Sequence, residues 1–424
     1  MSSRLSPYWI LLLAFAIRVA VAVGMPSEPT SDAADYHRLA VGLAAGNGYV
    51  DVSGRPTADR PPGYPAFVAL VYRAVGVNPT AVYVAEALLG VGTVWLVYVI
   101  GALLLGPSRA RMAALIAAVY PGLFWLPRLM LAENLAIPLQ LSALCVAALL
   151  LRKPRMLLAS ALGGLLGVGM LVRASGLIFS GVLLLCVTFA LCRADRTWRA
   201  VVPVGVCVVG LVLTLVPWTV RNHAVFDRFV PLATQQGIGL YSSYWPSQTS
   251  AKRIWGTLAS ADDPAIVALP ESRNEAHRSA QLQALTLQKL RAQPGYFLAV
   301  LPEKILYLLS PFDWETFPHA PGQTRSLNIG YLLVLIPALF GLVVLYRKPV
   351  PDQWLLWVIP VSVLVQAIVF YGSPRFRIPA EVTAILLASA GLDRAWHSRR
   401  RWLPGGDLRG TDRSATEDGA PLEG

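Results

Sequence analysis

The sequence has few charged residues, histidines and cysteines, and each shortage excludes a class of protein. Only 14% of the 424 residues are charged, whereas a soluble globular domain carries about 25%, so an ordinary water-soluble enzyme is excluded. The four cysteines lie in or beside apolar runs without the spacing of a metal site or a disulfide framework. We therefore expect them to be small buried side chains.

The charge that is present is mostly basic, with 36 Lys and Arg against 24 Asp and Glu. A basic protein that binds nucleic acid needs a solvated basic face, but 55% of this chain is hydrophobic. We therefore expect no nucleic-acid partner. The basic excess instead indicates a membrane protein that retains its basic residues on the cytoplasmic side.

Apolar runs of roughly 17–25 residues can cross a bilayer as helices. The first of these runs contains Arg18 and is followed by further spans, so we read it as an uncleaved helix and not as a signal peptide. The sequence predicts an all-α polytopic membrane protein with about ten transmembrane helices. The runs lie near 8–24, 80–105, 111–126, 131–151, 156–172, 175–191, 200–219, 326–346, 353–371 and 378–392.

Basic residues concentrate in alternate connections between these runs, and the positive-inside rule assigns those connections to the cytoplasm. We therefore predict a multi-pass plasma (inner) membrane protein with both termini in the cytoplasm, interacting with membrane lipids. The cytoplasmic connections hold Arg109, Arg111, Arg152, Lys153, Arg155, Arg193, Arg196, Arg199, Arg347 and Lys348.

Within the predicted membrane domain, residues 1–392, two long loops then face outward, at 25–79 and 220–325. Loops of this length are usually functional. The second loop is predicted to contain a polar helix near 272–292 and an amphipathic helix near 295–310. The remaining residues, 393–424, are predicted to be a disordered cytoplasmic tail.

The first outer loop begins with acidic residues at the start of a predicted helix. Ser31 or Asp32 can cap this helix, whose apolar positions Leu39 and Leu43 recur at helical spacing. Asp35 follows one turn after Asp32. The alternative to a functional role is that Asp32 is only an N-cap.

Later in this loop Arg60 precedes Pro61-Pro62-Gly63-Tyr64. The prolines predict a rigid turn that leads into a short, half-buried helix. A planar guanidinium at the membrane surface suits phosphate recognition. The alternative is that Arg60 extends its side chain toward lipid headgroups.

Three carboxylates lie within apolar runs, where a buried acid is costly and is a functional candidate. Glu133 lies at the outer end of its predicted span, on the same side as Asp32. We expect Glu86 to be structural and to pair with an arginine, and Glu381 to neutralise nearby arginines. If the spans form one bundle, the acids and arginines at the outer ends of the spans open to one surface. Acids suit activation of a hydroxyl nucleophile, and arginines suit a lipid-linked phosphate.

Five short motifs follow one another at similar order and spacing to those of a known family. The chain resembles the integral-membrane GT-C glycosyltransferases, specifically their ArnT and protein O-mannosyltransferase-like branch, over residues 1–392. The motifs are Asp32-x-x-x-Tyr36, Arg60-Pro61-Pro62-Gly63-Tyr64, Ala132-Glu133-Asn134-Leu135, Pro217-Trp218-x-x-Arg221-Asn222 and Arg375-Phe376-Arg377-Ile378-Pro379.

The resemblance implies transfer of a hexosyl or pentosyl group from a polyprenyl phosphate donor to an acceptor hydroxyl at the outer face. The acceptor is a lipid, a polysaccharide or a protein. Asp32 matches the family's general base, and Asp35 is the reserve because Ala33 stands where the family often has a second acid. Glu133 resembles the acid of the family's second outer loop.

The resemblance also implies an inverting displacement and a set of binding residues. Some relatives use a divalent metal ion, but no His/Asp cluster of this sequence demands one, so no cofactor is assigned. The expected donor-phosphate contacts are Arg60, Arg173, Arg221 and Arg375, and the expected substrate contacts are Tyr36 and Tyr64.

Two other classes remain open from the sequence. A transporter or flippase of a lipid-linked sugar would also use outer arginines, but it would place acids near the bilayer midplane on broken helices. A non-catalytic assembly partner is the third class. The acids of this chain gather at one face beside a long loop, which favours the enzyme.

Overall fold

The computed structural model describes residues 7–195, 197, 201–245, 248–249, 252–253, 259, 263–270, 272, 274–312 and 327–400, with backbone alone at 248–249, 252–253 and 398–400. Ten apolar helices form a bundle, which confirms the predicted all-α polytopic fold. Five of them are long and apolar enough to cross a membrane by length and composition. The ten are α1 (Tyr8–Gly24), α4 (Pro79–Leu104), α5 (Pro107–Val119), α7 (Glu133–Arg152), α8 (Met156–Val172), α9 (Gly176–Ala194), α10 (Val202–Phe226), α15 (Ile329–Arg347), α16 (Leu355–Val369) and α17 (Pro374–Arg400).

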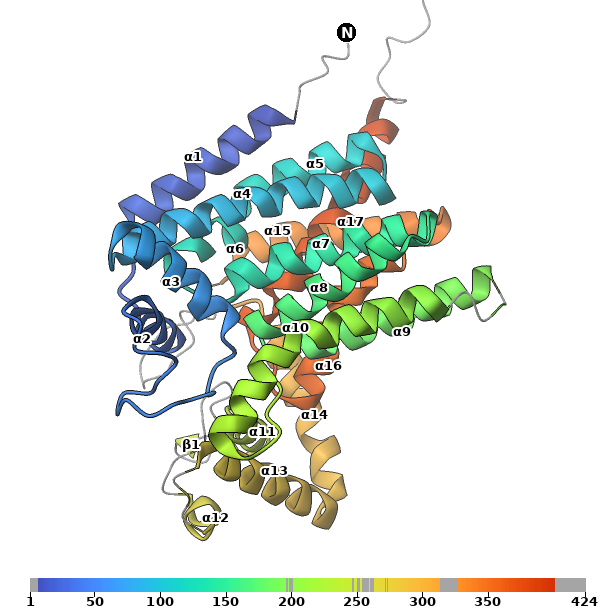
Figure 1. The fold of residues 1–424 in the computed structure, drawn as a ribbon. Helices are drawn as coiled ribbons and strands as arrows, with labels where there is room; N and C mark the ends of the chain where they lie inside the picture. Colours follow the sequence, from blue (N-terminus) through green and yellow to red (C-terminus); the bar gives the residue numbers. More distant parts are fainter. Residues whose placement is uncertain are drawn as a thin grey trace, which may run out of the picture.

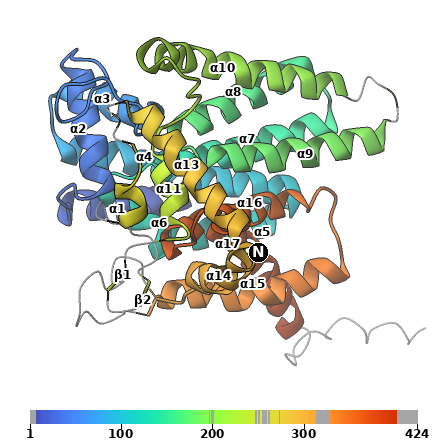
Figure 2. The ribbon, with the colours of Figure 1, turned by 90° about the horizontal axis from the view of Figure 1, so that it is seen from below.

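The remaining elements are mostly short helices of the two long loops. Helices α2, α3, α11 and α13 gather at one end of the bundle, whereas the α4–α5, α7–α8 and α9–α10 turns lie at the other (Figures 1 and 2). The two loops therefore share one side. These elements are α2 (Asp32–Ala44), α3 (Gly63–Val75), α6 (Pro121–Phe124), the 3-10 helix η1 (Leu126–Leu129), α11 (Gln236–Ser242), the antiparallel strands β1 (Gln248–Thr249) and β2 (Lys252–Arg253), α12 (Pro264–Val267), α13 (Glu275–Ala292) and α14 (Pro294–Leu308).

The predicted span at 111–126 is wrong as a continuous helix. Helix α5 ends at Val119, Tyr120 is extended with φ −74° and ψ 120°, and the chain restarts as α6 at Pro121. A proline has no N–H and disfavours helical backbone in the residue before it, so Pro121 favours the break after Val119.

This break explains the arginine in the first span. The end of α5 leaves backbone carbonyls without intrahelical donors, which is costly inside a membrane. Arg18 is fully buried in α1 and donates from Nη2 to the Ala117 carbonyl at 3.0 Å and from Nη1 to the Ala118 carbonyl at 2.9 Å.

We expect Arg18→Met to lower the free energy of unfolding by about 1–3 kcal/mol, because it leaves buried carbonyls unsatisfied. The measurement is unfolding in detergent micelles. Arg155 is exposed at the α7–α8 turn, so Arg155→Met should change stability by less than about 0.5 kcal/mol. Equal stability of the two variants would contradict this role for Arg18.

The structure differs from the sequence prediction at the tail and agrees with it in the second outer loop. Helix α17 continues to Arg400, so residues 393–400 are helical and not disordered as predicted. The prediction ended the helix where the apolar run becomes charged. Leu, Arg and Ala favour helix whether or not the segment is apolar, so the helix continues beyond the apolar run. Residues 401–424 lie outside the described residues. The predicted polar and amphipathic helices are confirmed as α13 and α14.

Candidate active site

Asp32 binds two arginines at the start of α2. Its Oδ1 accepts from Nη2 of Arg60 at 2.8 Å, and its Oδ2 accepts from Nη1 of Arg375 at 2.7 Å. Neither Ser31 nor Asp32 caps the helix with its side chain, and Ser31 has φ 52°, a strained backbone for a residue other than glycine. The capping interpretation of Asp32 is therefore wrong, because both carboxylate oxygens contact guanidinium groups.

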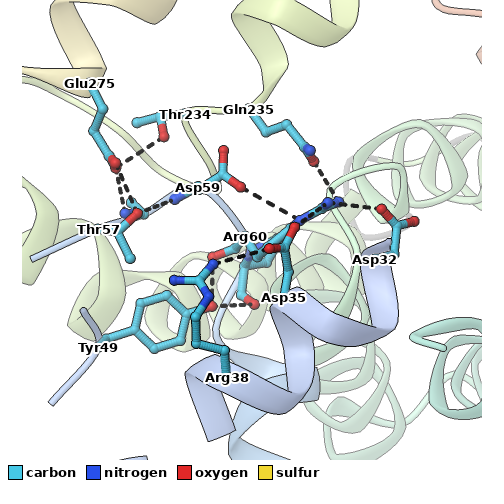
Figure 3. A network of polar contacts seen from close by, with 12 residues as sticks. Asp32, Asp35, Arg38, Tyr49, Thr57, Asp59, Arg60, Thr234, Gln235 and Glu275 are labelled. Atoms are coloured by element: carbon cyan, nitrogen blue, oxygen red, sulfur yellow. Dashed lines mark hydrogen bonds and ion pairs between the residues drawn. The ribbon is translucent and has the colours of Figure 1, made fainter. Parts of the chain in front are cut away.

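Arg60 lies at the centre of contacts from both long loops (Figure 3). Its Nη2 also donates to Asp35 at 2.9 Å, and its Nη1 donates to the Gln235 side chain at 2.7 Å. The side chain is only 11% exposed and lies over the Tyr36 ring, 5.6 Å from its centroid. Arg60 therefore binds protein groups in this structure, and the interpretation that it only reaches lipid headgroups is not supported.

The turn after Arg60 is held by a close backbone approach. Helix α3 begins at Gly63, where a Cβ atom would lie 2.8 Å from the Leu171 carbonyl oxygen. Only glycine fits this approach. The contact holds the start of α3 against the end of α8, and Arg173 follows α8 directly. The Pro-Pro-Gly turn thus brings Arg60 and Arg173 to the same end of the bundle.

Glu133 is fully buried at the start of α7 and holds two arginines. Arg375 donates to it from Nε at 2.6 Å and from Nη2 at 3.0 Å, and Nη1 of Arg173 lies 3.0 Å from Oε1. The segment before α7 contains Met130 with φ 46°, a second non-glycine residue with left-handed backbone next to a site acid. Glu133 positions Arg375 and Arg173, and it is fully buried, whereas the similarly bound Asp32 is 26% exposed, so Asp32 is the more accessible of the two acids.

These contacts form one ion-pair network of alternating charge from five separate chain segments. Three acids and three arginines form its centre, and their formal charges cancel; Arg38 and Asp59 extend it by one charge of each sign. Phe376 packs beneath two of the guanidinium groups, with its ring centroid 4.7 Å from Arg173 and 5.8 Å from Arg375. Solvent reaches the network through side chains that are 26% and 34% exposed, those of Asp32 and Asp35. The network members are Asp32, Asp35, Glu133, Arg60, Arg173 and Arg375.

The network sets the ionisation of the residues around Arg60. Burial acts to raise the pKa of Asp32, but Arg375 and Arg60 outweigh it and lower this pKa to about 2. Burial and the Asp32 charge raise the pKa of Tyr36 to about 12. Burial opposes the charge of Arg60, but Asp32 and its other acidic neighbours raise the Arg60 pKa above its ordinary value. Asp32 is thus a carboxylate, and Tyr36 is a neutral hydroxyl.

Arg221, predicted as a phosphate contact, lies outside the network. Its Nη1 donates to the Thr57 carbonyl at 2.7 Å, its Nη2 donates to the Tyr49 carbonyl at 3.0 Å, and its guanidinium lies over the Trp218 ring. Arg221 therefore clamps the first outer loop to α10. In this structure loop carbonyls occupy this guanidinium, and the phosphate contact of Arg221 stays a prediction.

Tyr64 and Glu86 form a buried pair beneath the network. Tyr64 is fully buried, its hydroxyl donates to Glu86, and its ring packs edge-on against Tyr36 at 4.7 Å. The expected arginine partner of Glu86 is therefore wrong, since a tyrosine takes that place. The burial of Tyr64 also separates it from the accessible acids, so the predicted substrate contact is not supported. Tyr36 does lie beside the network, under Arg60.

The acids of the site are interleaved with guanidinium groups and do not gather around a common centre. Within the part of the chain that the structure describes, no group of three or more His, Cys, Asp or Glu side chains could hold a metal ion. These residues do not fit a resident divalent metal, and we derive no step through one. The remaining candidate acid, Glu381, pairs with Arg377 at 2.6 Å, as expected for neutralisation.

Three contacts of the site were not predicted from the sequence. Gln235 lies in the second outer loop without a motif, Arg38 pairs with Asp35 at 3.0 Å, and Asp59 lies 3.6 Å from Arg60. Arg38 stands one turn after Asp35 on α2, so helical spacing could have identified that pair. Nothing comparable marks Gln235, whose position depends on how the two loops pack.

Known proteins resemble this chain in sequence and in fold. Residues 59–219 match the family model described as dolichyl-phosphate-mannose-protein mannosyltransferase. The apo crystal structure of the Archaeoglobus fulgidus oligosaccharyltransferase matches with a TM-score of 0.57 at 12% identity, over 94% of this chain and 52% of that chain. The same protein in complex with Zn and sulfate matches with a TM-score of 0.55 at 13% identity, over 92% and 50%. This chain thus spans about half the length of that protein.

ArnT from Cupriavidus metallidurans bound to undecaprenyl phosphate is a weaker match, with a TM-score of 0.43 at 15% identity over 93% of this chain and 79% of that one. No curated protein sequence matches the chain significantly. The helical bundle has the fold of the oligosaccharyltransferase, and together with the family match over residues 59–219 this confirms the predicted resemblance to the integral-membrane GT-C glycosyltransferases.

Proposed function

We propose that this protein is a glycosyltransferase that moves a sugar from a polyprenyl phosphate to an acceptor hydroxyl at the outer face of the membrane. The single observation that carries the proposal is the convergence of Arg60, Arg173 and Arg375 on Asp32 and Glu133 at the end of the bundle where both long loops lie. The match to a family described by a lipid-phosphate-linked sugar donor supports it.

The arginines are suited to the leaving group of this reaction. A departing polyprenyl phosphate needs its negative charge neutralised, and guanidinium groups bind phosphate oxygens through paired N–H donors. Because the network is electrically balanced without a ligand, an entering phosphate must compete with Asp32 for Arg60 and Arg375. Glu133 is buried and doubly bound, so it retains Arg375 at the site during this exchange.

In the proposed reaction the acceptor hydroxyl oxygen attacks the anomeric carbon and forms the new glycosidic bond. The bond from that carbon to the phosphate oxygen breaks on the opposite face, so the configuration inverts. The polyprenyl phosphate leaves with the bonding electrons, and the acceptor proton passes to the Asp32 carboxylate. A carboxylate with a pKa near 2 is a weak base. When the donor phosphate draws Arg60 and Arg375 away from Asp32, the pKa of Asp32 rises and Asp32 becomes a stronger base.

A small cavity of about 30 Å³ lies beside the network, between the spans. Its lining includes Arg173 and Phe376 of the site. Its other walls come from α7, α8, α9 and α16, and include the apolar side chains of Leu139, Leu166, Phe179 and Val363. A phosphate at Arg173 would therefore have this cavity next to it, but the spans must separate there before an isoprenoid chain can enter.

The position in the membrane belongs to the same proposal. We place both termini in the cytoplasm of a cell with an inner or plasma membrane, because the basic connections then lie inside. The network and both long loops then face outward, where an envelope lipid, polysaccharide or protein can supply the hydroxyl. A protease protection assay on loop 25–79 tests this orientation.

The pH dependence should report the competition for Asp32. Asp32 must be deprotonated to act, and its lowered pKa keeps it so down to about pH 2 in the free enzyme. We expect activity to fall as pH falls, with the acid limb of kcat at higher pH than that of kcat/KM, because kcat reports the donor complex. The measurement is the transfer rate between pH 3 and 7. Identical acid limbs would contradict displacement of Asp32 from its arginines.

Binding of undecaprenyl phosphate to the purified protein tests the proposal without knowledge of the sugar. We expect saturable binding that weakens by about tenfold or more in Arg60→Ala, since one charge-assisted contact contributes about 1.5–3 kcal/mol. Arg155→Met is the matched control because Arg155 is exposed on the other side of the bundle. No binding, or equal binding by both variants, would contradict a donor-phosphate site at Arg60.

A further inference from the structure

Glu275 ties the second outer loop to the chain segment that carries Arg60 (Figure 3). Its Oε2 accepts from the Thr57 hydroxyl at 2.8 Å, and its Oε1 accepts from the Ala58 backbone N–H at 2.5 Å and from the Thr234 hydroxyl at 3.0 Å. Glu275 is the first residue of α13. One carboxylate thus joins the two long loops, and its contacts in the first loop lie two and three residues before Arg60.

The position of Glu275 is itself fixed. Asn274 caps α13 by accepting from the backbone N–H groups of Ala276 and His277, and its side-chain amide donates to the Phe226 carbonyl at 2.9 Å. A carboxylate at a helix N-terminus is stabilised by the helix dipole. We call the contacts of Glu275 with Thr57, Ala58 and Thr234 the clasp. The clasp therefore starts from a residue at an anchored helix end.

The clasp fixes two residues that contact the Arg60 guanidinium, Asp59 and Gln235. On one side, Thr57 accepts from the Asp59 N–H at 3.0 Å, which fixes the residue next to Arg60. On the other side, the Thr234 N–H donates to the Ala58 carbonyl at 2.8 Å, and the next residue, Gln235, accepts from Arg60. Glu275 contacts neither Arg60 nor Asp32 in this structure, so any effect it has on them passes through these neighbours.

We propose that Glu275 is a positioning residue for Arg60: it holds the first outer loop and Thr234–Gln235 together, so that Arg60 faces Asp32 and the donor phosphate. This inference rests on the proposed function for its consequence in catalysis. The clasp itself is a structural statement that can be tested separately. It also makes the second outer loop part of the donor site, so a movement of α13 changes the phosphate contact.

The variant Glu275→Ala is expected to weaken undecaprenyl phosphate binding by roughly tenfold, as for residues coupled in one hydrogen-bond network. Glu275→Gln keeps the shape and one acceptor oxygen, and should restore most of the affinity. Gln288→Ala is the control, because Gln288 lies exposed on the same helix. It should bind as the unaltered protein does.

A double-variant cycle separates positioning from general stability. If Glu275 acts through Arg60, Glu275→Ala should cause no further loss of affinity once Arg60→Ala is present. Losses that multiply in the double variant would overturn the proposal. So would unchanged affinity in Glu275→Ala.

Hydrogen exchange of residues 55–62 provides a readout that needs no lipid. We expect faster exchange in Glu275→Ala than in Gln288→Ala, because the Ala58 N–H loses its acceptor. Faster exchange with no lipid binding by any variant would leave the clasp in place and contradict the proposed function. Unchanged exchange would overturn the clasp whatever the lipid binding.

Discussion

Asp32→Asn is expected to reduce sugar transfer by about 10²–10⁴-fold, the range that a general base contributes. Asparagine has nearly the same shape but cannot accept the acceptor proton. The same change removes the negative charge that competes for Arg60 and Arg375. Undecaprenyl phosphate should therefore bind to the variant at least as tightly as to the unaltered protein. Loss of transfer together with unweakened phosphate binding is specific to a base.

Isolated membranes in which lipid-linked sugars have been radiolabelled provide the measurement, as movement of label from the lipid pool to envelope acceptors. Asp35→Asn is the matched control, since Asp35 also pairs with Arg60 but does not contact Arg375. We expect the control to keep more activity than Asp32→Asn. If Asp32→Asn transferred sugar at the unaltered rate, Asp32 could not be the base, and Asp35 would become the candidate.

Arg375→Ala is expected to reduce both stability and transfer. This arginine supplies two of the donors to the fully buried Glu133 and one to Asp32. Removing one partner of a buried ion pair costs about 3–5 kcal/mol, and here Arg173 still pairs with Glu133, so we expect a loss of up to about 3 kcal/mol. The variant should unfold at a clearly lower temperature in detergent and should show no measurable transfer.

A second change separates these two effects. Glu133→Gln in the Arg375→Ala background restores the charge balance of the network, so part of the thermal stability should return. Transfer should remain lost, because the donor phosphate still lacks Arg375. Recovery of transfer along with stability would contradict a phosphate contact and would leave Arg375 with a role in folding alone.

The sequence predicted five of the six network residues from their common side of the membrane, and Asp35 as the reserve base. Span counting and the positive-inside rule assign chain ends to one surface or the other, and this is enough to group Asp32, Arg60 and Glu133. It does not determine which side chains touch. Asp32 and Arg375 are separated by 343 positions, and their contact depends on how α2 packs beside the start of α17.

Two kinds of contact could not be predicted from the sequence. Arg221 lies on the predicted side and in a family-like motif, but loop carbonyls occupy its guanidinium. Gln235 and Glu275 are ordinary polar residues in a loop, and only the packing of the second outer loop on the first gives them a role. The break at Tyr120 is a different case. Pro121 favours a break at this point, but the residues on both sides are apolar and have the composition of one continuous span.

Comparison of envelope glycans by mass spectrometry tests the central claim most directly. The comparison uses cells that lack the protein, complemented with the unaltered chain, with Asp32→Asn or with Asp35→Asn. We predict that one specific sugar decoration is missing without the protein, returns with the unaltered chain, and does not return with Asp32→Asn although that variant reaches the membrane. An unchanged set of envelope glycans and glycoproteins, or full restoration by Asp32→Asn, would contradict this account.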